Sequence, residues 1–214
     1  MNEPKEVSPG NRSSERRVVQ SLRRIALEIV VGFVGVYAAF ALTAYKDRRD
    51  QIERRHQIKR ALIAELKPMP RLNRSNAIGY RRVLAEWDSS IAAGVTRAPG
   101  PYFQAVGVQN HVWEATKASG GLELLDAPTF FQLSEFYSEW TNMLAQYAQL
   151  RDFSLNEIYP GIDRGVNSFY VPGTSKPRPI LEVYRWDLVQ LARMSDGLAT
   201  RSDSLIKILS RDTI

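Results

Sequence analysis

The apolar run at residues 25–45 limits the fold of this chain more than any other feature. It reads IALEIVVGFVGVYAAFALTAY and is framed by arginine and lysine on both sides. A helix of this length measures about 32 Å at 1.5 Å per residue, close to the roughly 30 Å hydrocarbon core of a bilayer. Its Ile, Val, Leu and Phe side chains each favour insertion by about 0.3 to 0.6 kcal/mol. We therefore expect residues 22–45 to form one transmembrane helix.

One stripe of this expected helix combines small residues with its single acidic residue. Glu28 lies one turn from the basic flank, with Arg24 four residues before it, and near the helix N-terminus, where the dipole favours an anion. Small side chains let helices approach closely in lipid, so the stripe is typical of a docking face for another helix. Gly and Ala are also simply common in spanning helices, which is the competing interpretation. The expected docking face consists of Glu28, Gly32, Gly35, Ala39 and Thr43.

A cleaved signal peptide is the alternative for this segment. A basic region precedes the apolar run, and Ala39-Phe40-Ala41 resembles a cleavage site. The run is longer than the 7 to 15 residues typical of a signal peptide, which favours the spanning helix.

The positive charge of the chain lies around this segment. Residues 1–67 hold 14 Lys and Arg against 8 Asp and Glu, whereas residues 68–214 hold 15 of each, so the net charge of +6 belongs to the first part. Basic residues beside a spanning helix favour contact with anionic lipid headgroups. The balanced remainder argues against nucleic acid as a partner. The expected headgroup contacts are Arg23, Arg24, Lys46, Arg48 and Arg49.

The composition along the chain predicts an all-α protein. We expect a disordered polar tail at residues 1–21, a charged helical stalk at 46–67, and a helical-bundle domain at 68–214 with irregular loops near 94–110 and 157–179. Pro68 and Pro70 should end the stalk helix, because proline lacks the amide donor that a helix interior requires. A second helix at 71–92 should bury residues that include Ile78 and Trp87.

An aromatic helix is expected to form the main buried face of the domain. Asp126 is a good N-cap, and Ser119-Gly120-Gly121 should end a short preceding helix. A last helix from about residue 180 to 210 should be interrupted near Asp196-Gly197. The aromatic helix carries apolar residues at spacings of three and four, which we call the aromatic seam: Phe130, Leu133, Tyr137, Trp140, Leu144 and Tyr147.

These features together resemble a family of uncharacterised bacterial single-pass membrane proteins. The resemblance extends from about residue 23 to 147 and rests on the spanning helix, the charged stalk, Trp113, Ser119-Gly120-Gly121, Leu122, Leu125 and the aromatic helix from Phe130 to Tyr137. It implies a helical fold and a bacterial envelope setting, and it carries over no active site.

No motif for chemistry is visible in the sequence. His56 and His111 lack the companions of a zinc site, and the chain has no cysteine. Glu123, Asp126, Glu135 and Glu139 could converge as an acid/base group, although each is explained more simply as a cap or a solvated residue. We therefore expect no catalytic, cofactor-binding or metal-binding residue.

The expected function is that of a non-catalytic accessory or structural subunit. It would stabilise a larger membrane protein complex, for example a photosynthetic, respiratory or transport complex, with other integral membrane subunits as partners. A homo-oligomeric envelope or signalling module and a membrane-anchored enzyme without a motif are the alternatives. The expected location is the bacterial inner membrane, with the N-terminus in the cytoplasm and the C-terminal domain in the periplasm. Because basic residues are dense on both sides of the span, the charge rule alone does not decide this orientation.

Overall fold

The all-α prediction is confirmed. A computed structural model describes the backbone of residues 12–100 and 110–211, and the side chains of residues 32–100 and 110–211. These parts of the chain contain no strand, only an isolated bridge between Tyr170 and Pro177. The helices are α1 (Arg12–Leu66), α2 (Met69–Ala92), α3 (His111–Ala118), η1 (Gly121–Leu124), α4 (Ala127–Phe153), η2 (Ser154–Ile158), α5 (Tyr159–Asp163), η3 (Val166–Phe169) and α6 (Ile180–Arg211).

The chain divides into two units, Met1–Glu53 and Arg54–Ile214. Helix α1 begins at Arg12, so residues 12–21, expected in the polar tail, are helical, and residues 1–11 lie outside the described residues. The helix ends at Leu66, and α2 follows with Pro70 in its first turn. The two prolines therefore end the stalk helix where the sequence predicted.

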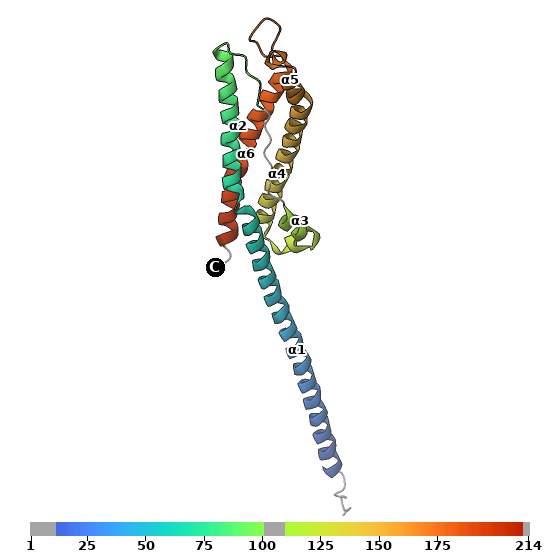
Figure 1. Cartoon of the computed structure of the whole chain (residues 1–214). Helices are drawn as coiled ribbons and strands as arrows, with labels where there is room; N and C mark the ends of the chain where they lie inside the picture. The colour runs from blue at the N-terminus through green and yellow to red at the C-terminus, as the bar shows by residue number, and fades with distance from the viewer. Residues whose placement is uncertain (1–11, 101–109, 212–214) are drawn as a thin grey trace, which may run out of the picture. The chain divides into compact units, whose positions relative to one another are not determined.

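Helix α6 packs between two other long helices of the second unit. It makes its main contacts with α2 and with α4, which flank it in Figure 1. Both pairs are antiparallel. Along α2, the partners of Arg74 and Arg81 on α6 are Asp203 and Asp196, so the numbering falls on one helix as it rises on the other.

The buried face of α6 repeats at three, four and seven residues, as expected for a helix that packs along a groove. Its large buried apolar residues are Leu181, Tyr184, Leu188, Leu191, Leu198, Leu205 and Leu209. Each side chain of this size contributes about 1.5 to 3 kcal/mol when it is fully removed from water. This burial is the main source of stability in the second unit.

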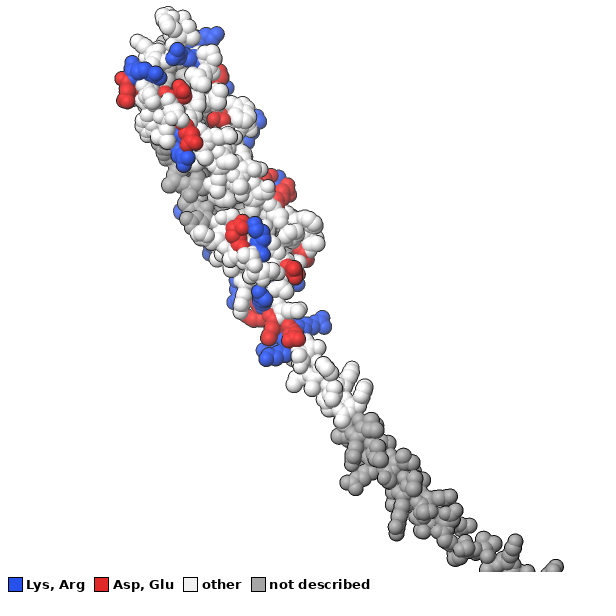
Figure 2. All heavy atoms as spheres, turned by 90° about the vertical axis from the view of Figure 1, so that its right-hand side faces the viewer, with Lys and Arg blue, Asp and Glu red and all other residues white. Residues whose placement is uncertain are grey.

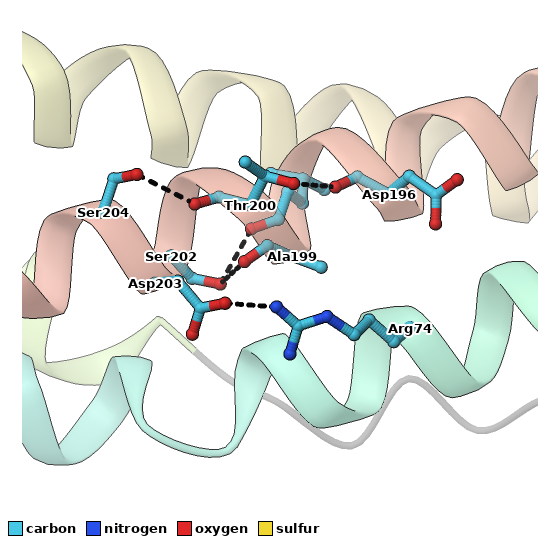
Figure 3. A network of polar contacts seen from close by, with 8 residues as sticks. Arg74, Asp196, Ala199, Thr200, Ser202, Asp203 and Ser204 are labelled. Atoms are coloured by element: carbon cyan, nitrogen blue, oxygen red, sulfur yellow. Dashed lines mark hydrogen bonds and ion pairs between the residues drawn. The ribbon is translucent and has the colours of Figure 1, made fainter.

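Ion pairs lie along the exposed edges of the α2–α6 contact. Figure 3 shows the pair between Arg74 and Asp203, with Ser202 beside it donating its hydroxyl to backbone carbonyls of its own helix. Arg185 binds Asp88 through two hydrogen bonds of 3.1 and 3.0 Å, and this bond raises the pKa of Arg185. Exposed pairs contribute about 0 to 1 kcal/mol each. They align the helices rather than hold them together.

The aromatic seam is buried as predicted at its centre and less so at its ends. Leu133, Tyr137 and Trp140 are buried, whereas Phe130, Leu144 and Tyr147 are only partly buried. Phe136 and Met143, which the prediction omitted, are also fully enclosed. Helix α4 packs against α6, and its Tyr137 also contacts Glu65 of α1 and Trp113 of α3, so its buried face is wider than a single stripe.

Two other predictions were wrong. Helix α6 continues without interruption through Asp196 and Gly197, because Gly197 lies on its exposed side and its neighbours on the buried side hold the helix against α2 and α4. On α2, Ile78 is 64 % exposed, while the polar Asn73 and Asn76 are buried. The face of α2 that packs against α6 is therefore determined by the register between the two helices, and it does not coincide with the most apolar stripe of α2.

The expected loop near 157–179 is partly helical. Helix α4 passes through the π-helical turn η2 into α5, so the irregular part starts only at Arg164. Val171, Pro172, Gly173 and Thr174 then form a turn in which the Thr174 N–H donates to the Val171 carbonyl, with Gly173 at φ +76°. The Tyr170 hydroxyl pins this excursion to the loop after α2, since it accepts from the Arg97 N–H (2.9 Å) and donates to the Arg97 carbonyl (2.8 Å).

Gly161 is required by close packing. A Cβ atom at this position would lie 2.4 Å from Cε1 of Phe169, a buried ring. We expect Gly161→Ala to lower the free energy of unfolding by about 1 to 3 kcal/mol, because the ring cannot move without disturbing its neighbours. Denaturant unfolding of the full chain, followed by the fluorescence of its four tryptophans, measures the change.

The matched control is Gly197→Ala on the exposed side of α6. No atom lies within 4 Å of its added Cβ, so alanine should stabilise the helix by up to about 1 kcal/mol. Equal effects of the two substitutions would contradict the packing described around Phe169.

Candidate interaction surfaces

The described part of the expected docking face lies on α1 and is open. Gly32 and Gly35 have no atom within 4 Å of a Cβ placed on them, and Ala39 is exposed. The Thr43 hydroxyl donates to the Ala39 carbonyl at 3.0 Å. This internal hydrogen bond lets the hydroxyl enter an apolar environment without an unpaired donor. The Glu28 side chain lies outside the described residues.

The other sides of this segment expose large apolar side chains. Residues 32–45 contain no charged residue, and the corresponding stretch is uniformly white in Figure 2. The exposed fractions run from 56 % for Val36 to 72 % for Phe40. Contiguous apolar surface of this kind marks a contact with protein or lipid. The residues are Phe33, Val34, Val36, Tyr37, Phe40, Leu42 and Tyr45.

The expected headgroup contacts follow directly after this stretch. Lys46, Arg48 and Arg49 are exposed on α1, and the side chains of Arg23 and Arg24 lie outside the described residues. Across the described part of the chain, no helix has a stretch both long enough and apolar enough to cross a bilayer. Residues 22–31 of the expected span are not among the described side chains.

A second surface is formed where residues 110–125, which we call the strap, pack on α1. The strap comprises α3 and η1. Its contacts with α1 fall on Arg54, Ile58 and Glu65, whose spacings of four and seven place them on one stripe of the helix. The stalk helix therefore already contacts the strap at Arg54, four residues before the apolar group that begins at Ile58.

Glu65 caps the N-terminus of α3. Its carboxylate accepts hydrogen bonds from the backbone N–H of Val112 (2.6 Å) and Trp113 (3.4 Å), while Asn110, the N-cap residue, makes no side-chain cap of its own. A carboxylate at this position satisfies amide donors that no intrahelical carbonyl can reach and also complements the helix dipole. The Tyr137 hydroxyl donates to the same carboxylate at 2.5 Å.

The C-terminal end of the strap also depends on α1. Arg54 donates to the Ser119 carbonyl at 3.4 Å. Gly120 adopts φ +68°, the left-handed conformation expected for a glycine that ends a helix. A Cβ on Gly121 would lie 2.8 Å from Cδ1 of Ile58, so the backbone of η1 passes directly over that side chain. The glycine pair thus has two separate roles, one conformational and one steric.

Asp126 is the N-cap of α4, as the sequence predicted. It accepts from the Thr129 N–H and from the Thr129 hydroxyl, both at 2.9 Å, and lies 3.6 Å from Arg55 of α1. The hydrogen bond from the Thr129 N–H, with a smaller contribution from the charge of Lys59, holds the pKa of Asp126 below its usual value.

The four carboxylates considered as an acid/base group do not converge. Glu135 and Glu139 meet at Arg201, with distances of 2.8 and 3.0 Å, but Asp126 is engaged as a cap and Glu123 is exposed. Among the described residues, no three His, Asp or Glu side chains are grouped closely enough to hold a metal ion. Figure 2 shows acidic and basic side chains interspersed on one face of the second unit.

The strap and the first turn of α4 together line an apolar hollow of about 480 Å³. Leu122, Leu125, Ala127 and Phe130 provide its apolar lining, with Lys117 and Glu123 among the polar residues. The ring of Phe131, centred 5.4 Å from that of Phe130, is 66 % exposed.

Sequence reasoning missed Glu65 and Arg54 as contact residues. One signal was present: Glu65 is an acidic residue within the apolar group at the end of a largely basic stalk. Its partners are backbone amides of a helix 47 residues away, so the sequence could not have indicated them.

The Asp126 cap should make stability depend on pH. Because its pKa in the folded chain lies below the ordinary value of 3.8, its stabilisation is fully present above that pH and is lost as the pH falls through the folded value. Asp126→Ala should therefore cost about 0.5 to 2 kcal/mol at neutral pH and progressively less below pH 3.8. Unfolding titrations of both proteins from pH 7 to pH 2 measure the difference, and a constant difference would exclude this role for the carboxylate.

The chain matches no protein-family model, and the searches of curated proteins and of solved structures also gave no match. The resemblance to bacterial single-pass membrane proteins therefore stays a prediction. Of the residues on which it rests, Trp113 stacks on Tyr137 with ring centroids 4.7 Å apart, and Gly120 and Gly121 shape the strap.

Proposed function

We propose that this chain is a non-catalytic, single-pass membrane subunit that docks on a larger membrane protein complex. The observation that carries the proposal is the stretch of α1 at residues 32–45, which exposes seven large apolar or aromatic side chains and no charge. Leaving such side chains in water forfeits about 25 cal/mol for every Å² of apolar surface that burial would remove. An environment of lipid or of partner helices removes that cost.

Lipid accounts for this stretch together with its flanks. The apolar run extends in sequence from residue 25 to 45, long enough for a bilayer, and basic residues follow it at once. Lys46, Arg48 and Arg49 are exposed and available to anionic headgroups, a role we also assign to Arg23 and Arg24. The internal hydrogen bond of Thr43 is consistent with a helix in hydrocarbon.

A partner helix accounts for the asymmetry of the stretch. Gly32, Gly35 and Ala39 lie on one side of α1, and Phe33, Val36 and Phe40 lie on another. Lipid would cover both sides equally well. A helix of another subunit would instead bind most favourably to the side with the small residues, which we call the flat side, because the two backbones can approach closely there. We therefore assign this side to a second integral membrane protein, with photosynthetic, respiratory and transport complexes as candidate hosts.

We place the chain in a bacterial inner membrane with its N-terminus in the cytoplasm and its second unit in the periplasm. Protease added to intact spheroplasts should then digest residues beyond 46, and alkaline washing should leave the undigested chain in the membrane fraction. Release of the full chain by alkaline washing would refute the anchor. Protection of the second unit from protease until the membrane is lysed would reverse the orientation.

The docking side is tested by one pair of substitutions. Gly35→Leu places a bulky side chain on the flat side and should lower recovery of the chain with its host complex after mild-detergent purification by about tenfold or more, because helix backbones can no longer meet. Ala41→Leu is the matched control, since it lies on another side of the helix and should leave recovery unchanged.

Quantitative recovery of the Gly35→Leu chain with the same complex would exclude this side as the docking surface. Recovery of the native chain only as a self-associated species would instead support a homo-oligomeric module.

A further inference from the structure

We propose that the strap is a latch: it opens from α1 as a separate unit while α2, α4 and α6 stay folded, and Glu65 sets how often it opens. The proposal concerns the second unit alone and is independent of the membrane role proposed above.

The strap cannot hold its own conformation. Helix α3 has eight residues and η1 has four, whereas isolated helices shorter than about 12 to 15 residues are marginal in water. The N-terminus of α3 has no side-chain cap from its own segment. The strap therefore folds only while its contacts with α1 and α4 persist.

Few buried side chains hold the strap in place. Trp113 and Leu125 are its buried large apolar residues, with Val112 and Leu122 partly buried. Helix α6, in contrast, buries seven large apolar residues along its length. Because opening free energy follows the apolar surface that must be exposed, the strap should open at a lower free energy than the bundle.

The polar contacts at both ends of α3 come from one stripe of α1. Glu65 binds amide donors at its N-terminus, and Arg54 donates to the Ser119 carbonyl just past its C-terminus. The signs match the dipole of α3, negative charge at the amide end and positive charge at the carbonyl end. A rotation of α1 by one residue position, about 100°, would turn both groups away together.

Tyr137 lowers the free energy of the open state. Its hydroxyl belongs to α4, which stays in the bundle, and it donates to the same Glu65 carboxylate that caps the strap. Burial and the neighbouring Glu65 raise the pKa of Tyr137, so this donor keeps its proton at physiological pH. When the strap leaves, Glu65 retains one hydrogen bond and is not left as an unpaired charge, which would strongly destabilise the open state.

Opening of the strap would also expose apolar and aromatic side chains that the strap covers in the closed state. It separates the Trp113 ring from the Tyr137 ring, now stacked with an interplanar angle of 10°. It also uncovers Ile58, over which Gly121 packs. The latch thus covers an apolar and aromatic face of α1 and α4 in the closed state and exposes it in the open state.

Hydrogen exchange of the full chain in detergent micelles tests the latch. In the native chain, amides of residues 112–119 should exchange faster than those at the centres of α4 and α6. Glu65→Gln should accelerate exchange across residues 112–119 by about tenfold or more, because a charged acceptor of two amide hydrogen bonds is lost. Exchange within α2, α4 and α6 should stay unchanged.

Two further variants keep the test decisive. Arg54→Gln alters an exposed residue, so the chain should fold normally, and it should also accelerate exchange in the strap, by a smaller factor. Glu123→Gln is the matched control, because this exposed residue of η1 should leave exchange unchanged. The latch is refuted if the strap exchanges only as fast as α6, or if Glu65→Gln accelerates exchange equally in all helices.

Discussion

The burial of one face of α6 against two antiparallel helices is the interaction on which the second unit depends. Its leucines and Tyr184 lose nearly all contact with water, whereas the ion pairs at its edges stay largely solvated. Apolar burial therefore supplies the free energy, and the charges contribute alignment. Asp187 is a buried acidic residue within this face: burial raises its pKa, and Gln146 of α4 donates to it at 2.6 Å. This hydrogen bond fixes the register between α4 and α6 at one polar point.

The strap extends this bundle by a different kind of contact. It buries two large apolar residues, Trp113 and Leu125, and a carboxylate and a guanidinium from α1 bind the two ends of α3. The strength of such hydrogen bonds depends on the distance and angle between donor and acceptor more than on buried area. Small displacements of α1 should therefore weaken them, although the same displacements would change the packing of a leucine face little. The second unit thus combines a core of long packed helices with one short element that is attached to α1 and α4.

The surface of α1 at residues 32–45 differs from the core of the second unit because its apolar side chains are not buried. Its large side chains are exposed, and its only side-chain hydrogen bond is internal to the helix among the contacts described there. A segment of this composition gains free energy only when something apolar covers it. The membrane function proposed for the chain follows from this requirement, while the second unit provides the structured body that such a subunit would present to its partner.

Local sequence patterns determined most of the secondary structure. The two prolines, the Asp126 cap and the glycine pair act through the backbone of their own neighbourhood, and each ended or began a helix where expected. The repeat of apolar residues likewise identified the centre of the buried face of α4. A helix boundary depends on dihedral angles and nearby hydrogen bonds, and both are properties of a few consecutive residues.

Tertiary structure alone decided which residues meet across the chain. Gly197 did not interrupt α6, because packing on both sides outweighs its weak helix propensity of about 1 kcal/mol. The partners of Glu65 lie 47 to 72 residues away, and Ile78 is exposed because the register of α2 on α6 turns another stripe inward. Periodicity in a sequence shows that a helix has an apolar face. It does not state which helix covers that face, since the answer depends on the free energy of the whole packing.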